Sequence, residues 1–248
     1  HVVDACRDLA ESRGLVITGS ELVGVVPYRA IRESGEHYLQ SQGSSCGIPT
    51  KDIIDTAIQS LGLADLSPFD VEATVLGMPT TRGELTGMEI HALTDEVSRD
   101  SPAPGGGSIA ALAGSLGAAL SSMVANLTFA KRKYRKRQPE MEELARHAQK
   151  LKNDLLLAVD EDTAAFEQVL VAMRLPQGNP EQEETRLKAI EAGYRHATEV
   201  PMNTARLCLE VLELAQTEPA ITSNEGPEPT KSASTLKKSL PLQSPGGK

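Results

Sequence analysis

The chain has very few aromatic residues: its 248 residues include no tryptophan, three phenylalanines and four tyrosines. Hydrophobic residues still make up 40% of the sequence, which is enough apolar material to build a core. Such a core must consist mostly of leucine, valine, isoleucine and alanine, and these residues favour closely packed helices over an aromatic-rich sheet. The composition therefore predicts a mainly α-helical protein.

Cysteine is also scarce, and acidic residues outnumber basic ones. The three cysteines are odd in number and far apart, so neither a disulfide framework nor a zinc site is predicted, and a reducing, cytoplasmic compartment is expected. The formal net charge of −9 argues against nucleic acid as the main partner, because phosphate binding needs a broad basic surface. The chain starts at His1 without a secretory leader, which we interpret as an internal start.

Residues 1–75 mix helical and strand patterns. The spacing of apolar residues predicts three helices, with Thr50 as the N-cap of the last; they cover residues 2–13, 28–39 and 51–61. Two short apolar runs predict strands, and Pro27 ends the second; they cover residues 15–18 and 22–26. This region is predicted to be a small α/β unit.

A polar, glycine-rich segment at 76–87 marks a predicted linker between two domains. A helical domain is predicted after it over 88–216, with helices at 88–99, 108–130, 141–173, 180–200 and 201–216. Residues 217–248 are rich in proline, serine, threonine, glutamate and lysine and have few large apolar side chains. This tail is predicted to be disordered, because too little burial offsets the entropy of ordering it.

An uncharged run at 105–130 is followed by a basic cluster, Lys131 to Arg137, which superficially resembles a membrane span with its cytoplasmic stop. We predict no span, because the run is full of glycine, serine and alanine and has few large apolar residues. Small residues instead permit close helix packing in a soluble bundle. The basic cluster is either a solvated helix end or a site for a small polyanionic ligand.

Three successive glycines, Gly105, Gly106 and Gly107, precede Ser108 at the start of a long predicted helix. Glycines would let backbone amides approach a ligand closely, and a helix N-terminus attracts an anion. A flexible loop capped by Ser108 explains the same pattern, and spacing alone favours this simpler interpretation.

An acidic residue lies close to a predicted buried stripe on the helix at 141–173. The stripe consists of Leu155, Val159, Phe166, Leu170 and Met173, and Asp162 falls about 60° from its centre at roughly 100° per residue. Because burial raises the pKa of a carboxyl group, an acid in a dry seam could keep its proton and act as a general acid. An aspartate that pairs with a basic residue or caps a neighbouring helix explains the position equally well.

Several of these segments together resemble the formiminotetrahydrofolate cyclodeaminase family; they are residues 101–108, 123–128, Lys131, 160–166 and 173–176. Residues 16–27 resemble the closing subdomain of glutamate formiminotransferase, the usual N-terminal partner in the bifunctional enzyme. The resemblance covers about residues 1–216. It implies that 1–75 are an α/β remnant of the formiminotransferase C-terminal subdomain and that 88–216 are an incomplete cyclodeaminase helical bundle.

The resemblance also implies a folate-dependent one-carbon enzyme of histidine degradation. In this family the transferase moves a formimino group to tetrahydrofolate, and the cyclodeaminase closes 5-formiminotetrahydrofolate to 5,10-methenyltetrahydrofolate with loss of ammonia. Polyglutamylated tetrahydrofolate is then substrate and carrier, and no metal is expected. Asp162 matches the family's catalytic aspartate, the acid that protonates the departing nitrogen. The residues expected to contact the folate or its carboxylates are Gly105, Gly106, Gly107, Ser108, Lys131 and Arg174.

Two departures from the family qualify these expectations. The transferase part lacks the catalytic histidine and the main folate groove, so transferase activity of this chain is not expected. The family's Gly-Asn and Ser-Asp segment and its further core helices are not found after residue 216. A non-catalytic folate-binding or subunit-association module is therefore the alternative to an active cyclodeaminase, and the intact enzyme is expected to be a homo-oligomer.

Overall fold

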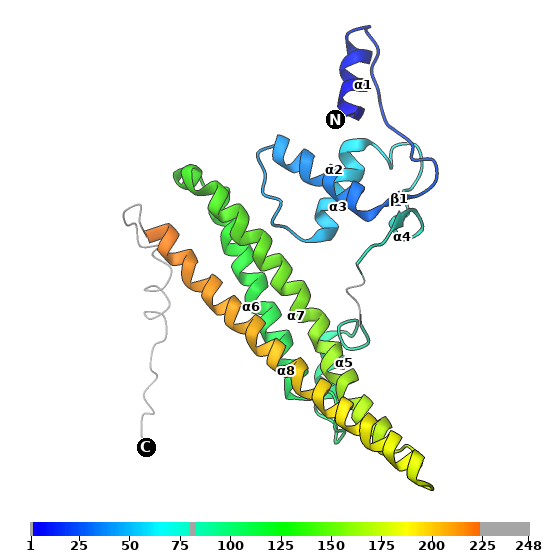
Figure 1. The fold of residues 1–248 in the computed structure, drawn as a ribbon. Coiled ribbons are helices and arrows are strands. Elements are labelled where there is room, and N and C mark those ends of the chain that lie inside the picture. Colours follow the sequence, from blue (N-terminus) through cyan, green and yellow to red (C-terminus); the bar gives the residue numbers. More distant parts are fainter. Residues whose placement is uncertain (1, 80–82, 224–248) are drawn as a thin grey trace, which may run out of the picture.

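The computed structural model describes residues 2–79 and 83–223, which form a small N-terminal module and a bundle of long helices (Figure 1). The mainly α fold class is confirmed. The elements of the first module are α1 (Val2–Glu11), β1 (Val26–Pro27), α2 (Tyr28–Ser41), α3 (Thr50–Leu61), α4 (Val71–Thr74) and β2 (Val75–Leu76). The three predicted helices of this region are all present.

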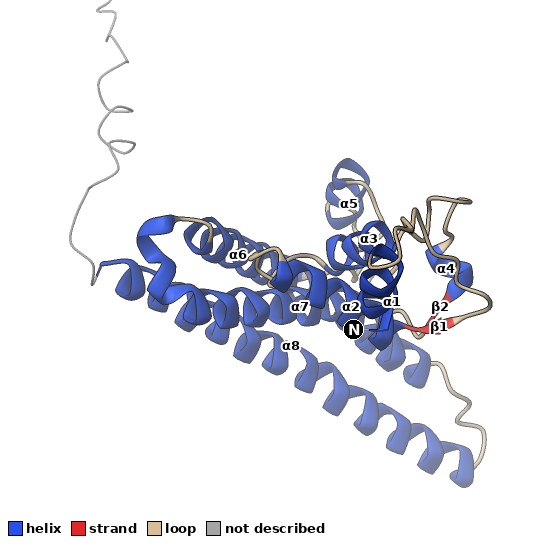
Figure 2. Ribbon diagram, turned by 90° about the horizontal axis from the view of Figure 1, so that it is seen from above, coloured by secondary structure: helices blue, strands red, loops and turns tan. Residues whose placement is uncertain are grey.

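The strands of the first module differ from the prediction. The run at 15–18 forms no strand, and the side chains of Leu15 and Val16 are mostly exposed because no neighbouring chain pairs with them. The second predicted strand shrinks to β1, which pairs in parallel with β2 through Val26 and Val75. Figure 2 shows this pair at the edge of the module. Thr50 is the first helical residue of α3 rather than its cap, since Pro49 holds the N-cap position.

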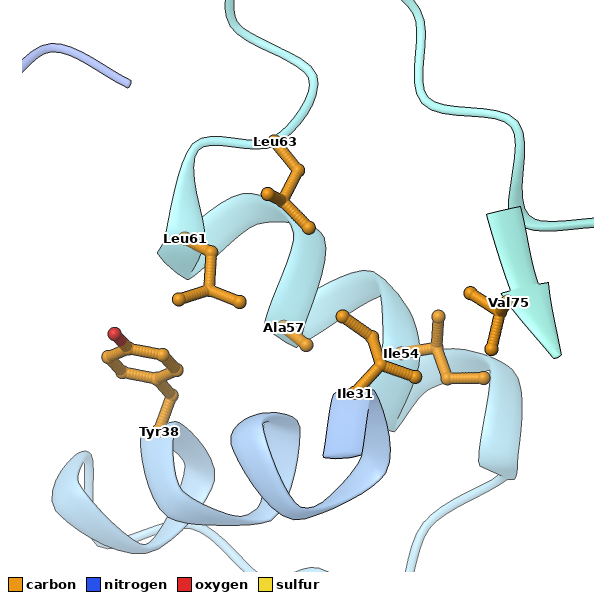
Figure 3. Close-up of a cluster of buried hydrophobic side chains, with 7 residues drawn as sticks. All are labelled: Ile31, Tyr38, Ile54, Ala57, Leu61, Leu63 and Val75. Atoms are coloured by element: carbon orange, nitrogen blue, oxygen red, sulfur yellow. The ribbon is translucent and has the colours of Figure 1, made fainter. Parts of the chain in front are cut away.

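The core of the first module lies between α2 and α3. Figure 3 shows its buried side chains, which are Ile31, Tyr38, Ile54, Ala57, Leu61, Leu63 and Val75. The two helices cross closely at Gly35, where an added Cβ atom would lie 2.0 Å from the carbonyl oxygen of Ile53. A glycine at this position therefore allows α2 and α3 to pack closely.

The second part of the chain consists of α5 (Ile90–Val97), α6 (Gly106–Phe129), a 3₁₀ turn η1 (Arg132–Arg137), α7 (Gln138–Met173) and α8 (Pro180–Ser223). The three long helices α6, α7 and α8 pack against one another along their length (Figures 1 and 2). Their contacts use small side chains on α6, among them the fully buried Ala111, Ala118 and Ala125. The close packing expected from small residues is therefore present.

By length and hydropathy α6 could cross a membrane, and 39% of its most apolar window is buried in the structure. It is the one helix of the described segments that meets these criteria. The core helix of a bundle meets the same criteria, so this is weak support for a span.

Three details of the predicted bundle are wrong. Residues 180–200 and 201–216 form one continuous helix, α8, which also extends beyond the predicted start of the tail to Ser223; residues 224–248 lie outside the described part of the chain. Of the predicted stripe of α7, Leu155 and Val159 are buried, Leu170 is partly buried, and Phe166 and Met173 are exposed. Beyond Val159 the buried positions of the helix are held by the smaller residues Ala165, Val169 and Ala172.

Candidate functional site

The site forms where the first turn of α6 meets the middle of α7. Asp162 lies on α7, and its Oδ2 atom accepts hydrogen bonds from the backbone N–H of Ser108 at 2.8 Å and from its Oγ at 3.1 Å. The Ser108 Oγ also lies 3.2 Å from the Oγ1 of Thr163. Ser108 is buried and Asp162 is partly exposed. Two segments that are 54 residues apart therefore meet at one carboxylate.

The triple glycine has one position where a side chain could not fit. A Cβ atom on Gly107 would lie 2.1 Å from Oδ1 of Asp162, whereas Gly105 and Gly106 have no atom within 4 Å of theirs. The close approach that the glycines allow is thus to a carboxylate of the same chain. The first turn of α6 thus directs its Ser108 amide to the carboxyl group of Asp162.

The structure corrects two expectations about these residues. Ser108 does not cap α6: Gly105 is the N-cap, without a side-chain capping bond, and Ser108 uses its hydroxyl for Asp162. Asp162 does not lie in a dry apolar seam, since it is partly exposed and hydrogen-bonded by donors from the next helix. The sequence left Asp162 as either a general acid or a residue that pairs with a basic side chain or caps a neighbouring helix. The geometry shows a contact with the N-terminus of the neighbouring helix α6. A proton held on this carboxylate stays a prediction.

A cavity of about 490 Å³ lies beside this contact. Thr163, which contacts Ser108, is in its wall, together with Ala103 and Pro104 from the segment before the glycines. The remaining lining residues are Glu84, Leu85, Met88, Glu96, Arg99, Asp160, Ala164 and Glu167. A volume of this size is within the range of small-molecule sites.

Asp160 is an anchor that the sequence interpretation missed. Its carboxylate accepts hydrogen bonds from the backbone N–H of Leu85 at 2.7 Å and from the hydroxyl of Thr86 at 2.8 Å. A Cβ atom on Gly83 would lie 2.2 Å from its Cγ. Asp160 therefore holds the segment before α5 against α7 and helps to form one wall of the cavity. Helical spacing within α7 could not reveal this role, because the donors to Asp160 lie 74 and 75 residues away along the sequence.

Lys131 and Arg174 lie far from Asp162 in this chain. Lys131 follows the C-terminal end of α6, and at 1.5 Å per residue it is about 35 Å from Ser108 along the helix axis. Arg174 is the C-cap of α7, about 18 Å along that helix from Asp162. Both side chains are exposed. The structure thus brings together Asp162 and the 105–108 segment and leaves the two basic residues outside.

The described segments contain no cluster of three or more histidine, cysteine, aspartate or glutamate residues that could hold a metal ion. The titratable groups around the cavity are mostly carboxylates, and its arginine, Arg99, pairs with Glu96 at 2.8 Å. The site as described offers a positioned acid, hydrogen-bond donors and an adjoining cavity. Such a site is suited to proton transfer to a small ligand.

Comparisons with known proteins agree with this arrangement of two modules. Residues 89–225 match the family model described as formiminotransferase-cyclodeaminase, and residues 1–78 match that of the formiminotransferase domain. A formimidoyltransferase-cyclodeaminase from Gallus gallus is 34% identical over 200 residues, which is 79% of this chain and 37% of that protein. A methenyltetrahydrofolate cyclohydrolase from Methylorubrum extorquens is 35% identical over 127 residues, which is 51% of this chain and 61% of that protein.

A solved formiminotetrahydrofolate cyclodeaminase from Thermotoga maritima has a TM-score of 0.38 and 23% identity, covering 62% of this chain and 85% of that one. At this TM-score the likeness adds no argument. The chain spans well under half the length of the Gallus gallus protein. Both of its modules match in the order of the bifunctional proteins, and the chain belongs to the formiminotransferase-cyclodeaminase family.

Proposed function

We propose that this chain carries the cyclodeaminase chemistry of its family, the closure of 5-formiminotetrahydrofolate to 5,10-methenyltetrahydrofolate with release of ammonia. The observation that supports it most directly is the Asp162 carboxylate, held by Ser108 beside a cavity of about 490 Å³. The match of residues 89–225 to the family model supports the reaction class. Tetrahydrofolate, in its polyglutamylated form, is the proposed carrier, and no metal takes part.

The proposed mechanism assigns a proton to Asp162. The second folate nitrogen attacks the formimino carbon and forms the new C–N bond, and the former imino nitrogen must then depart. This nitrogen takes up the proton that the attacking N–H loses and a second proton from Asp162, so that its C–N bond breaks with ammonia as the leaving group and the 5,10-methenyl cation remains. The N–H and hydroxyl of Ser108 hold the carboxylate in place as it gains and loses that proton.

The test replaces Asp162 with asparagine and follows the absorbance of the methenyl product from 5-formiminotetrahydrofolate. Loss of general acid catalysis lowers the rate by about 10² to 10⁴-fold, while folate binding is largely kept. Asp154→Asn is the matched control, because Asp154 lies on the same helix and forms a surface pair with Lys150. Turnover retained by Asp162→Asn at the rate of the control would refute the role of this residue.

A second candidate function is hydrolysis of the methenyl compound itself. It is favoured by the 35% identity to a methenyltetrahydrofolate cyclohydrolase over half of this chain. In that reaction Asp162 would accept a proton from the attacking water. Supplying 5,10-methenyltetrahydrofolate and following its disappearance, without the formimino substrate, separates the two activities. Folate binding without turnover of either compound would instead indicate a non-catalytic module.

We also propose that the protein works in the cytoplasm as a homo-oligomer that does not span a membrane. Its three cysteines are free thiols, as is usual in a reducing compartment. The outer face of α6 supports self-association, since it exposes a row of large apolar side chains, Leu116, Leu120, Met123 and Leu127. Lys131 lies at the C-terminal end of this row, and it and Arg174 remain candidates for contacts with folate carboxylates in the assembled enzyme.

A further inference from the structure

The loop between α2 and α3 inserts into the side of the bundle. The backbone N–H of Cys46 donates to both carboxylate oxygens of Glu142 on α7, at 2.9 and 3.1 Å. The carbonyl oxygen of Gly47 accepts from the Oγ of Ser122 at 3.0 Å and from the Nδ2 of Asn126 at 2.8 Å, both on α6. Two successive residues of the first module are thus bonded to two helices of the second.

The backbone of Gly47 packs so closely against Ala145 of α7 that no side chain fits between them. An added Cβ atom would lie 2.2 Å from the Cβ of Ala145 and 2.7 Å from its carbonyl carbon. Ala145 is fully buried on α7, and Cys46 is 2% exposed. Only a glycine therefore lets the loop reach the groove between α6 and α7.

The contact continues into a polar network inside the bundle. Ser122 also accepts a hydrogen bond from Gln149 at 2.8 Å, and Gln149 in turn accepts one from the Nζ of Lys152 at 2.7 Å. Burial lowers the pKa of Lys152 and raises the pKa of the Cys46 thiol to about 11. Ser122 and Cys46 are each 2% exposed, and Gln149 and Lys152 are partly buried, so this network lies where hydrogen bonds are strong and unpaired polar groups are costly.

An ion-pair cluster lies at the edge of the same contact. Arg146 on α7 approaches Glu36 of α2 at 3.2 Å and Glu142 of its own helix at 2.7 Å. The guanidinium joins the carboxylate that holds Cys46 to a carboxylate of the first module. Ion pairs and hydrogen bonds therefore both join the first module to α7.

We propose that residues 45–48, Ser122, Asn126 and Glu142 form a latch that fixes the first module to the bundle in one orientation. Each bond of the latch specifies a particular partner atom, so the contact selects an orientation as well as a location. Ser122 lies about 21 Å along α6 from Ser108. The polar side chains of Ser122 and Asn126 therefore serve the junction of the two modules in this chain and lie away from the Asp162 site.

Asn126→Asp is the sharpest test, because it keeps the shape of the side chain and changes its donor into a carboxylate oxygen. That oxygen would face the Gly47 carbonyl at the present 2.8 Å, where two acceptors repel and a buried charge has no partner. Hydrogen exchange in the whole chain is the readout. We expect the Cys46 amide to exchange at least tenfold faster, and small-angle scattering to show a larger radius of gyration. Asn203→Asp, the same change on an exposed part of α8, should leave both unchanged.

A second variant acts from the other side of the contact. Gly47→Ala places its methyl group against Ala145 without altering any residue of the bundle. It therefore still tests the latch if the Asn126→Asp variant fails to fold. Unchanged protection of the Cys46 amide and an unchanged radius of gyration in a folded Asn126→Asp or in Gly47→Ala would overturn the latch. Neither measurement depends on turnover, so the outcome is independent of the proposed reaction.

Discussion

At the scale of single residues, the carboxylate of Asp162 occupies the position that a side chain on Gly107 would need at the start of α6. The carboxylate approaches the helix terminus because Gly107 has no side chain, and Ser108 then supplies two donors. Each of these hydrogen bonds contributes about 0.5 to 1.5 kcal/mol. The position of the proposed acid therefore depends on a residue that has no functional group of its own.

Gly107→Ala is expected to displace Asp162 and break its hydrogen bonds to Ser108. We expect the free energy of unfolding in urea to fall by about 1 to 3 kcal/mol, and the proposed cyclodeaminase rate to fall with it. Gly106→Ala is the matched control, because its methyl group meets open space. Equal free energies of unfolding for Gly107→Ala and Gly106→Ala would contradict the prediction that a side chain at position 107 displaces Asp162.

The sequence singled out Asp162 and the triple glycine, but only as separate features. Their meeting joins residues 54 positions apart, and helical spacing within one segment carries no information about such a distance. The family resemblance likewise suggested that Lys131 and Arg174 contact the same folate as Asp162, but it could not show how far they lie from Asp162 along α6 and α7. Residue types were thus predictable, and the tertiary contacts between them were not.

At the scale of elements, α8 continues through a proline that was predicted to divide it. Pro201 has no N–H to bond the carbonyl of Ala197, and its ring crowds that oxygen. The helix nevertheless packs on both sides of this position, through Val200 before it and Thr204 and Val211 after it, all of which are buried. Tertiary packing on a common face keeps the helix continuous, and local propensity could not show this.

Pro201→Ala is expected to stabilise the chain by about 2 kcal/mol, because it restores a helical hydrogen bond at a cost in unfolded-state entropy. Urea unfolding monitored by circular dichroism measures the change. Pro176→Ala, in the loop between α7 and α8, should give no gain, since no helix lies there to be repaired. An unchanged or lower free energy of unfolding for Pro201→Ala would contradict the cost that we assign to a proline inside a continuous α8.

At the scale of the whole molecule, the outer face of α6 is left exposed by the described segments, residues 2–79 and 83–223. Its exposed apolar row spans Leu116 to Leu127, about three turns of helix. Soluble monomers rarely expose such a contiguous row, which is why self-association is the proposed state. Composition and hydropathy had revealed that this helix is apolar, but they could not show which of its faces is left uncovered.

Leu120→Glu is expected to convert the proposed oligomer to a monomer, because it places a charge in the middle of the α6 row. Size-exclusion chromatography with light scattering gives the mass of each form. Leu66→Glu introduces the same charge at a 70% exposed position of the first module and should leave the mass unchanged. A wild-type chain with the mass of one subunit would contradict the proposed association.

The short pairing of β1 with β2 determines how the first module would respond to mechanical tension. The chain leaves this module after Met78, which packs against the core, so once the latch at residues 45–48 is released a pull from the bundle reaches the two-residue ladder before it reaches α2 or α3. Pro27 cannot donate to that ladder, which makes it weaker still. Stretching the chain would then peel Met78 and Val75 out of the core and lengthen the tether by about 3.3 Å for each residue released, while the paired helices stay folded.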